Sequence, residues 1–222
     1  MARKSEKHSP YFNLTDAFKV QHCPICYLAR RSVTHYLDGL LYERVTDPGT
    51  VASVRASEGF CEHHFRQIIE FQDATGLSAL ARYALEFLVQ KLTQDPKTLR
   101  KKAAPPALCP ACKTWNETEA SYIGLFLENL EDPSFMFDYE HSFGFCMPHF
   151  KMIYPKIENE THREKLLKTQ IAKMESLIKE LADFERKHSY EHQGESYGKE
   201  ADSRFRAVEF LKGRSDKFHE RK

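Results

Sequence analysis

The sequence has no apolar run long enough to cross a membrane, which takes about 20 consecutive apolar residues. Charged residues make up 29% of the 222 residues, and the mean hydropathy is −0.60. The first 14 residues are charged and polar, without the apolar segment of a signal peptide. We therefore expect a cytoplasmic protein with no membrane segment.

The sequence also lacks an excess of either charge, because 33 Lys and Arg residues are balanced by 32 Asp and Glu residues. A net charge of +1 argues against strong, sequence-independent binding to nucleic acid, which depends on a concentration of positive charge. The short basic clusters at residues 30–31 and 100–102 are better explained as solvated surface. Nucleic acid is therefore not a favoured partner.

No segment shows the sustained alternation of β-branched and polar residues that indicates a strand. Apolar residues instead recur at intervals of three and four, which is typical of one face of a helix. This spacing follows residues 26 and 112 and continues in residues 68–92 and 153–181. The sequence thus predicts an all-α protein.

Cysteine is sparse, and all six cysteines belong to one repeated pattern. The pattern is a Cys-Pro-x-Cys motif followed, after an Asp-Pro dipeptide, by Gly-Phe-Cys-x-x-His. The first copy begins at Cys23 and ends at His64, and the second begins at Cys109 and ends at His149. Agreement at this many positions indicates an internal duplication.

The duplication suggests a division of the chain into four parts. They are a first helical repeat (1–93), a linker (94–108), a second helical repeat (109–188), and a polar loop with a C-terminal helix and tail (189–222). In each repeat, a long helix is expected to begin at Cys-Pro-x-Cys and to end near Asp-Pro.

The type and spacing of the motif residues favour metal binding over disulfides, because disulfides are rare in the cytoplasm. Three Cys and one His are the ligand set of a closed zinc site, and each repeat supplies this set. We expect two zinc ions, each bound within one repeat, by Cys23, Cys26, Cys61 and His64 in the first and by Cys109, Cys112, Cys146 and His149 in the second. The predicted fold is then a two-repeat helical bundle with two metal-binding knuckles.

Other chemistries remain open for the same residues. Three Cys and one His can hold an iron–sulfur cluster, which would make the chain an electron-transfer protein with two clusters. Redox dithiols are a third reading, although a thioredoxin-like motif needs a βαβ context that the sequence does not show. Phe60 and Phe145, which precede the third cysteine of each set, are expected to form a dry shell around the metal.

Several nearby residues are weaker candidates. His63 precedes His64, but the second repeat has Pro148 at the equivalent position, so His64 is the favoured ligand. His22 has no histidine counterpart in the second repeat. Four ligands per ion leave no open position for a substrate, which favours structural over catalytic sites. An enzyme would need other acid or base groups, and the candidates are Glu43, Glu128, Asp38 and His35.

The duplicated motifs, together with the helix Tyr-Leu-x-x-Leu-Leu-Tyr-Glu and the closing segment 200–213, resemble a bacterial family of uncharacterised proteins, a domain of unknown function. The resemblance spans about residues 11–213 and implies a small bacterial or archaeal protein, without implying an activity. The resulting hypothesis is a zinc-stabilised helical binding or adaptor module with an unidentified protein partner. The sequence leaves a homodimer open.

Overall fold

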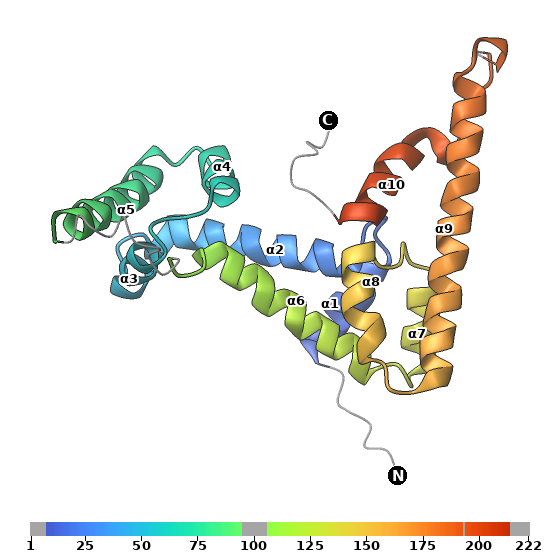
Figure 1. The fold of residues 1–222 in the computed structure, drawn as a ribbon, viewed down its shortest axis with the longest axis horizontal. Helices are drawn as coiled ribbons and strands as arrows, with labels where there is room; N and C mark the ends of the chain where they lie inside the picture. Colours follow the sequence, from blue (N-terminus) through green and yellow to red (C-terminus); the bar gives the residue numbers. More distant parts are fainter. Residues whose placement is uncertain (1–7, 95–105, 193, 214–222) are drawn as a thin grey trace. The chain divides into compact units, whose positions relative to one another are not determined.

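The structure is a computed structural model that describes residues 8–94, 106–192 and 194–213. These residues form ten α-helices and contain no strand, which confirms the predicted all-α class (Figure 1). The α-helices are α1 (Ser9–Phe18), α2 (Pro24–Gly39), α3 (Pro48–Ala56), α4 (Glu62–Glu70), α5 (Ala74–Gln94), α6 (Pro110–Glu128), α7 (Pro133–Glu140), α8 (Met147–Ile153), α9 (Glu160–His188) and α10 (Ser203–Lys212). Most of the predicted linker and the end of the predicted tail lie outside the described residues.

The two Asp-Pro dipeptides each begin a short helix. The Asp47 carboxylate accepts a hydrogen bond from the backbone N–H of Thr50 at 2.9 Å, and Pro48 is the first residue of α3. Asp132 and Pro133 begin α7 in the same way. Aspartate and proline suit these positions because the backbone N–H groups of a first turn have no partner within the helix. As predicted, the long helix after each Cys-Pro-x-Cys ends before Asp-Pro, since α2 continues in a π-helix over Leu40–Arg44 and α6 ends at Glu128.

The chain divides into two compact units, which are described separately. The first unit contains residues 1–28 and 119–222. In it α1 packs against α7, and α10 packs against α8 and α9 (Figure 1). Its core contains four fully buried rings, and that of Phe126 makes edge-to-face contacts with Tyr139 and Phe145, at centroid distances of 5.0 and 4.7 Å. Phe145 precedes Cys146, so this aromatic cluster helps to fix the position of the second Gly-Phe-Cys segment.

The second unit contains residues 29–118. In this unit α5 packs against α3 and α4. A hydrogen bond of 2.9 Å from Thr118 Oγ1 to Ser32 Oγ joins α6 to α2. The most deeply buried apolar residues of this core are Val33, Leu37, Leu40, Val54, Ile68, Leu80 and Ala111.

The compact units and the sequence repeats are different divisions of the chain. The boundaries between the units fall inside two helices, between residues 28 and 29 of α2 and between residues 118 and 119 of α6. Each unit therefore contains residues of both repeats. Within the described part of the chain, no helix is long and apolar enough to span a membrane.

Candidate metal centres

Every half of the repeated motif lies at the N-terminus of a helix. Cys23 precedes α2, Pro24 is its first residue and Cys26 lies in its first turn, and α6 begins in the same way. Cys61 is the N-cap of α4 and His64 is its third residue, an arrangement that α8 repeats. Helix N-termini carry unpaired N–H groups and a positive partial charge. They therefore favour thiolate ligands at these positions.

The structure gathers the eight predicted residues into two groups of four. The first-unit site consists of Cys23, Cys26, Cys146 and His149, and the second-unit site consists of Cys61, His64, Cys109 and Cys112. The expectation that each repeat completes its own site is therefore wrong. Each Cys-Pro-x-Cys meets the Gly-Phe-Cys-x-x-His of the other repeat.

The length of the helices gives the physical reason for this exchange. Helix α2 has 16 residues and carries the chain about 24 Å from the first Cys-Pro-x-Cys. The following helix, α3, has 9 residues, about 14 Å, and packs against α5, so the chain stays in the second unit after α2. The first Gly-Phe-Cys-x-x-His instead meets the N-terminus of α6, which carries the other Cys-Pro-x-Cys.

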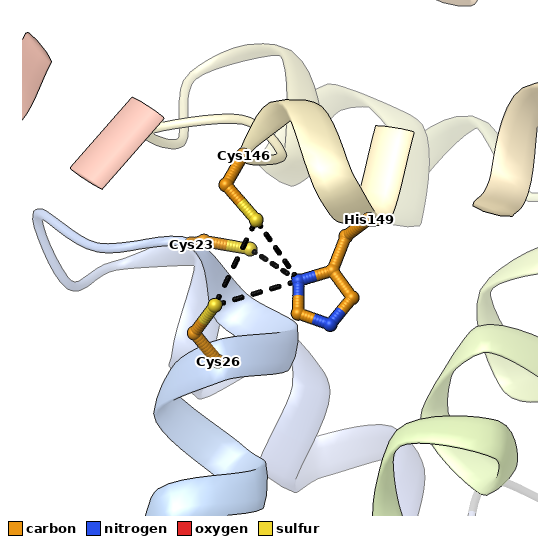
Figure 2. Close-up of side chains that lie close together, drawn as sticks. All are labelled: Cys23, Cys26, Cys146 and His149. Carbon is orange, nitrogen blue, oxygen red and sulfur yellow. Dashed lines mark hydrogen bonds between the residues drawn. The ribbon is translucent and has the colours of Figure 1, made fainter. Parts of the chain in front are cut away.

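Figure 2 shows the first-unit site, in which Nδ1 of His149 faces three sulfur atoms. The distances from this nitrogen to Sγ are 3.4 Å for Cys23, 3.4 Å for Cys26 and 3.0 Å for Cys146. The Sγ atoms of Cys26 and Cys146 are 3.7 Å apart. Around one tetrahedral zinc ion, with bonds of about 2.3 Å to sulfur and 2.0 Å to nitrogen, the ligand atoms would be about 3.5–3.8 Å apart. Three of the four distances are close to this range, and the distance from Nδ1 to Sγ of Cys146 is about 0.5 Å shorter, so the site has about the size of a single zinc ion.

The second-unit site has nearly the same dimensions. Nδ1 of His64 lies 3.1 Å from Sγ of Cys61, 3.5 Å from that of Cys109 and 3.4 Å from that of Cys112. The Sγ atoms of Cys61 and Cys112 are 3.7 Å apart. The two sites differ in exposure, because all four residues of the first-unit site are buried, whereas Cys61 and Cys112 are half-buried.

A glycine allows the turn that leads into each Gly-Phe-Cys segment. Gly59 has φ 103° and Gly144 has φ 88°, in the left-handed region that side chains disfavour. The next residues, Phe60 and Phe145, are buried, and each belongs to a core cluster that includes cysteines of the same site. In the first unit, the fully buried Gln170 donates a hydrogen bond of 2.6 Å to the carbonyl of Phe145. This bond holds the backbone next to Cys146.

A carboxylate that the sequence analysis missed contacts the ligand histidine of the first-unit site. Nε2 of His149 lies 2.8 Å from Oε1 of Glu119 in α6. With Nδ1 directed at the sulfurs, Nε2 carries the proton and donates to the carboxylate, as is usual for metal-binding histidines. The repeat comparison gave no signal for Glu119, because the equivalent position in the first repeat is Val33.

Helix α10 covers the first-unit site. The Glu209 carboxylate accepts a hydrogen bond of 3.1 Å from the backbone N–H of Cys23, and its other oxygen lies 2.9 Å from Nδ1 of His22. Gly213 follows α10, and a Cβ atom there would lie 3.5 Å from the sulfurs of both Cys26 and Cys146. The only sequence signal for this cover was the place of segment 200–213 in the family resemblance.

The other candidate residues lie outside both groups. His63 is half-buried, and its ring packs edge-on against that of His64 at a centroid distance of 4.9 Å. The structure thus brings His64, and not His63, to the sulfurs, in agreement with the repeat comparison. His22 contacts Glu209 instead. The acid and base candidates are all exposed, namely Glu43, Glu128, Asp38 and His35.

The crowding of sulfur atoms shifts the protonation of the ligands. Burial raises the pKa of Cys23, but hydrogen bonds with Cys146, Cys26 and His149 outweigh it and hold this pKa well below its usual value. Burial lowers the pKa of His149, yet its hydrogen bonds with the sulfurs raise it to about 11. Burial raises the pKa of Cys112 to about 12. His149 and Cys112 therefore retain protons when no cation is bound, and metal binding would release them.

These features define a class: an all-α protein with two groups of three Cys and one His, each of which could hold a metal ion. The model of a family of unknown function, DUF6062, matches residues 10–218, and the chain belongs to this family. The predicted resemblance to an uncharacterised family is therefore confirmed.

One relative is the uncharacterized 23.9 kDa protein in the xynA 3' region of Caldicellulosiruptor sp. (strain Rt8B.4). It is 22% identical over 202 residues, which cover 90% of this chain and 99% of the relative. No solved structure matches the chain.

Proposed function

We propose that the protein binds two zinc ions, one at each site, and that both ions are structural. The proposal depends on one observation, which is that three Sγ atoms and one Nδ1 atom lie within 4.8 Å of one another in each group. Four protein ligands close a structural zinc site, whereas a catalytic zinc keeps one position open for water or substrate. The ion at the first-unit site would join the start of α2 to the start of α8, 120 residues apart.

The ligand spacing supports a single ion over the alternative of an iron–sulfur cluster. A cluster places several iron and sulfide atoms among its ligands, so cysteine sulfurs bound to different irons stand farther apart than those around one ion. In each site, the Sγ atoms of one cysteine pair are 3.7 Å apart. That distance is close to the edge of a tetrahedron with bonds of about 2.3 Å. A set of thiolates and one imidazole also suits zinc.

On the same ground we assign the protein to binding or adaptor modules rather than enzymes. All four positions around each ion would be filled by side chains, so neither ion would have a place for a substrate. The cytoplasm suits such a protein because thiols stay reduced there. The partner of this module would be a protein, either a different one or a second copy of the same chain.

Elemental analysis of protein purified without oxygen tests the metal. We expect two zinc ions per chain, whereas iron with strong visible absorption would overturn the assignment in favour of clusters. Because the metal joins distant segments, its removal by a chelator should unfold much of the helical structure, as measured by circular dichroism. Full helicity after loss of both ions would contradict the structural role.

Paired substitutions test which residues share an ion. Cys26→Ser with Cys146→Ser removes two ligands from one site, so the chain should retain one ion. Cys26→Ser with Cys61→Ser removes one ligand from each site and should weaken or abolish both. Binding within each repeat would give the opposite result for the two double variants. Each pair thus serves as the matched control for the other.

A further inference from the structure

Each site contains an equivalent pair of cysteines, but the surroundings of the two pairs differ. Cys26 and Cys146 correspond in the repeat to Cys112 and Cys61, and the Sγ–Sγ distance is 3.7 Å in both pairs. Cys26 and Cys146 are 2% and 0% exposed. The sulfurs of this pair face Gly213 at the end of α10. Cys61 and Cys112 are both half-buried. The two pairs therefore have the same Sγ–Sγ distance, but Cys61 and Cys112 are more accessible to reagents than Cys26 and Cys146.

We propose that Cys61 and Cys112 form an oxidation site for hydroperoxides, which convert the pair to a disulfide and release the ion of the second-unit site. In this proposal α10 protects the first-unit site from the same reaction. The inference rests on the proposed function, since it assumes that each site holds an ion through thiolates.

The reaction balances with hydrogen peroxide as the oxidant. One thiolate of the pair attacks a peroxide oxygen, the O–O bond breaks, and the departing hydroxide takes a proton to become water. The sulfenic acid that results is attacked by the second thiolate, the S–O bond breaks, and a second water leaves after protonation. Two thiolates lose two electrons, and the peroxide gains them. An organic hydroperoxide would release one alcohol and one water.

The geometry favours this pair for closure. A disulfide bond is about 2.05 Å long, so sulfurs that start 3.7 Å apart need to approach by only about 1.7 Å. Closure would remove two of the four ligands. Cys109 and His64 would then remain, and two protein ligands are too few for a stable zinc site.

The test uses zinc-loaded, full-length protein whose metal content has been measured first. Hydrogen peroxide is added in the presence of a chromophoric chelator, and the released zinc is counted. We expect one of the two ions to be released rapidly. Peptide mapping under non-reducing conditions should then find Cys61 linked to Cys112. Release of both ions at one rate, release of neither, or a first disulfide between Cys26 and Cys146 would overturn the proposal. A protein that contains no metal before oxidation would instead refute the proposed function.

A variant of α10 tests the protective cover. Glu209→Ala removes the carboxylate that holds Cys23, so the first-unit ion should be released about tenfold faster by peroxide. Lys212→Ala changes an exposed charge on the same helix and should leave that rate unchanged. Equal rates in both variants, with helicity preserved, would refute the protective role of α10. The wild-type peptide map needs no variant and decides the rest of the proposal.

Discussion

Glu119 provides the sharpest test of how the first-unit site binds its metal. Its carboxylate accepts the Nε2–H of His149 at 2.8 Å, and the side chains of Glu119 and His149 are 19% and 4% exposed. Removing such a partner of a ligand histidine costs about 10- to 100-fold in metal affinity. Because Glu119 retains some contact with water, we expect Glu119→Ala to weaken zinc binding by about tenfold, or about 1.4 kcal/mol.

The measurement is a competition titration against a chelator of known affinity. A Cys112→Ser background leaves only the first-unit site complete, so the titration has a single step. Glu119→Gln keeps an oxygen acceptor and should recover most of the loss. Glu117→Ala is the matched control, because this carboxylate lies on the same helix, is 67% exposed and is 3.9 Å from Lys113. If Glu119→Ala and Glu117→Ala bind zinc equally well, the assigned role of Glu119 is wrong.

Three further results are expected. In urea titrations, Gly144→Ala should lower the free energy of unfolding by about 1–2 kcal/mol, because φ is 88° and the new Cβ would lie 2.6 Å from Cδ of Lys173. The matched control, Gly124→Ala, has no atom within 4 Å of the new Cβ and should raise the free energy of unfolding by about 0.5–1 kcal/mol. Gln170→Leu should cost about 1–3 kcal/mol, since it removes the buried hydrogen bond to Phe145, and an unchanged melting temperature would contradict this. Acidification from about pH 7 to about pH 5 should release both ions into an ultrafiltrate, because protons compete with the metal for the thiolate and imidazole ligands. Metal release that does not depend on pH would refute thiolate ligation.

The helical class and the identity of the gathered residues could be read from the sequence because both are local. Apolar spacing of three and four residues is a property of single helices. The choice of His64 over His63 needed only the comparison with Pro148 in the second copy. The Asp-Pro dipeptides likewise marked the ends of the two long helices without any knowledge of the fold.

The exchange of partners could not be read in the same way. A repeat shows that four half-sites exist, but two pairings of these halves satisfy the same ligand counts. Which pairing forms depends on where the chain lies after α2 and α6, and this position is set by the length and packing of the helices. Glu119 and Glu209 were missed for a related reason, since neither lies in the repeated motif and each reaches the first-unit site from a distant helix.

The exchanged pairing also makes the two sites nested along the chain, which has a consequence for biosynthesis. The second-unit site spans residues 61–112 and lies wholly between the halves of the first-unit site. During synthesis its ligands all emerge before His149 does, so it can capture metal first. An ion that links Cys61 to Cys112 removes 51 residues from the effective length of the 120-residue loop between Cys26 and Cys146. Closing the loop at the second-unit site first thus lowers the entropy cost of closing the loop at the first-unit site by about 0.5 kcal/mol. The second-unit site is therefore expected to bind its ion before the first-unit site does.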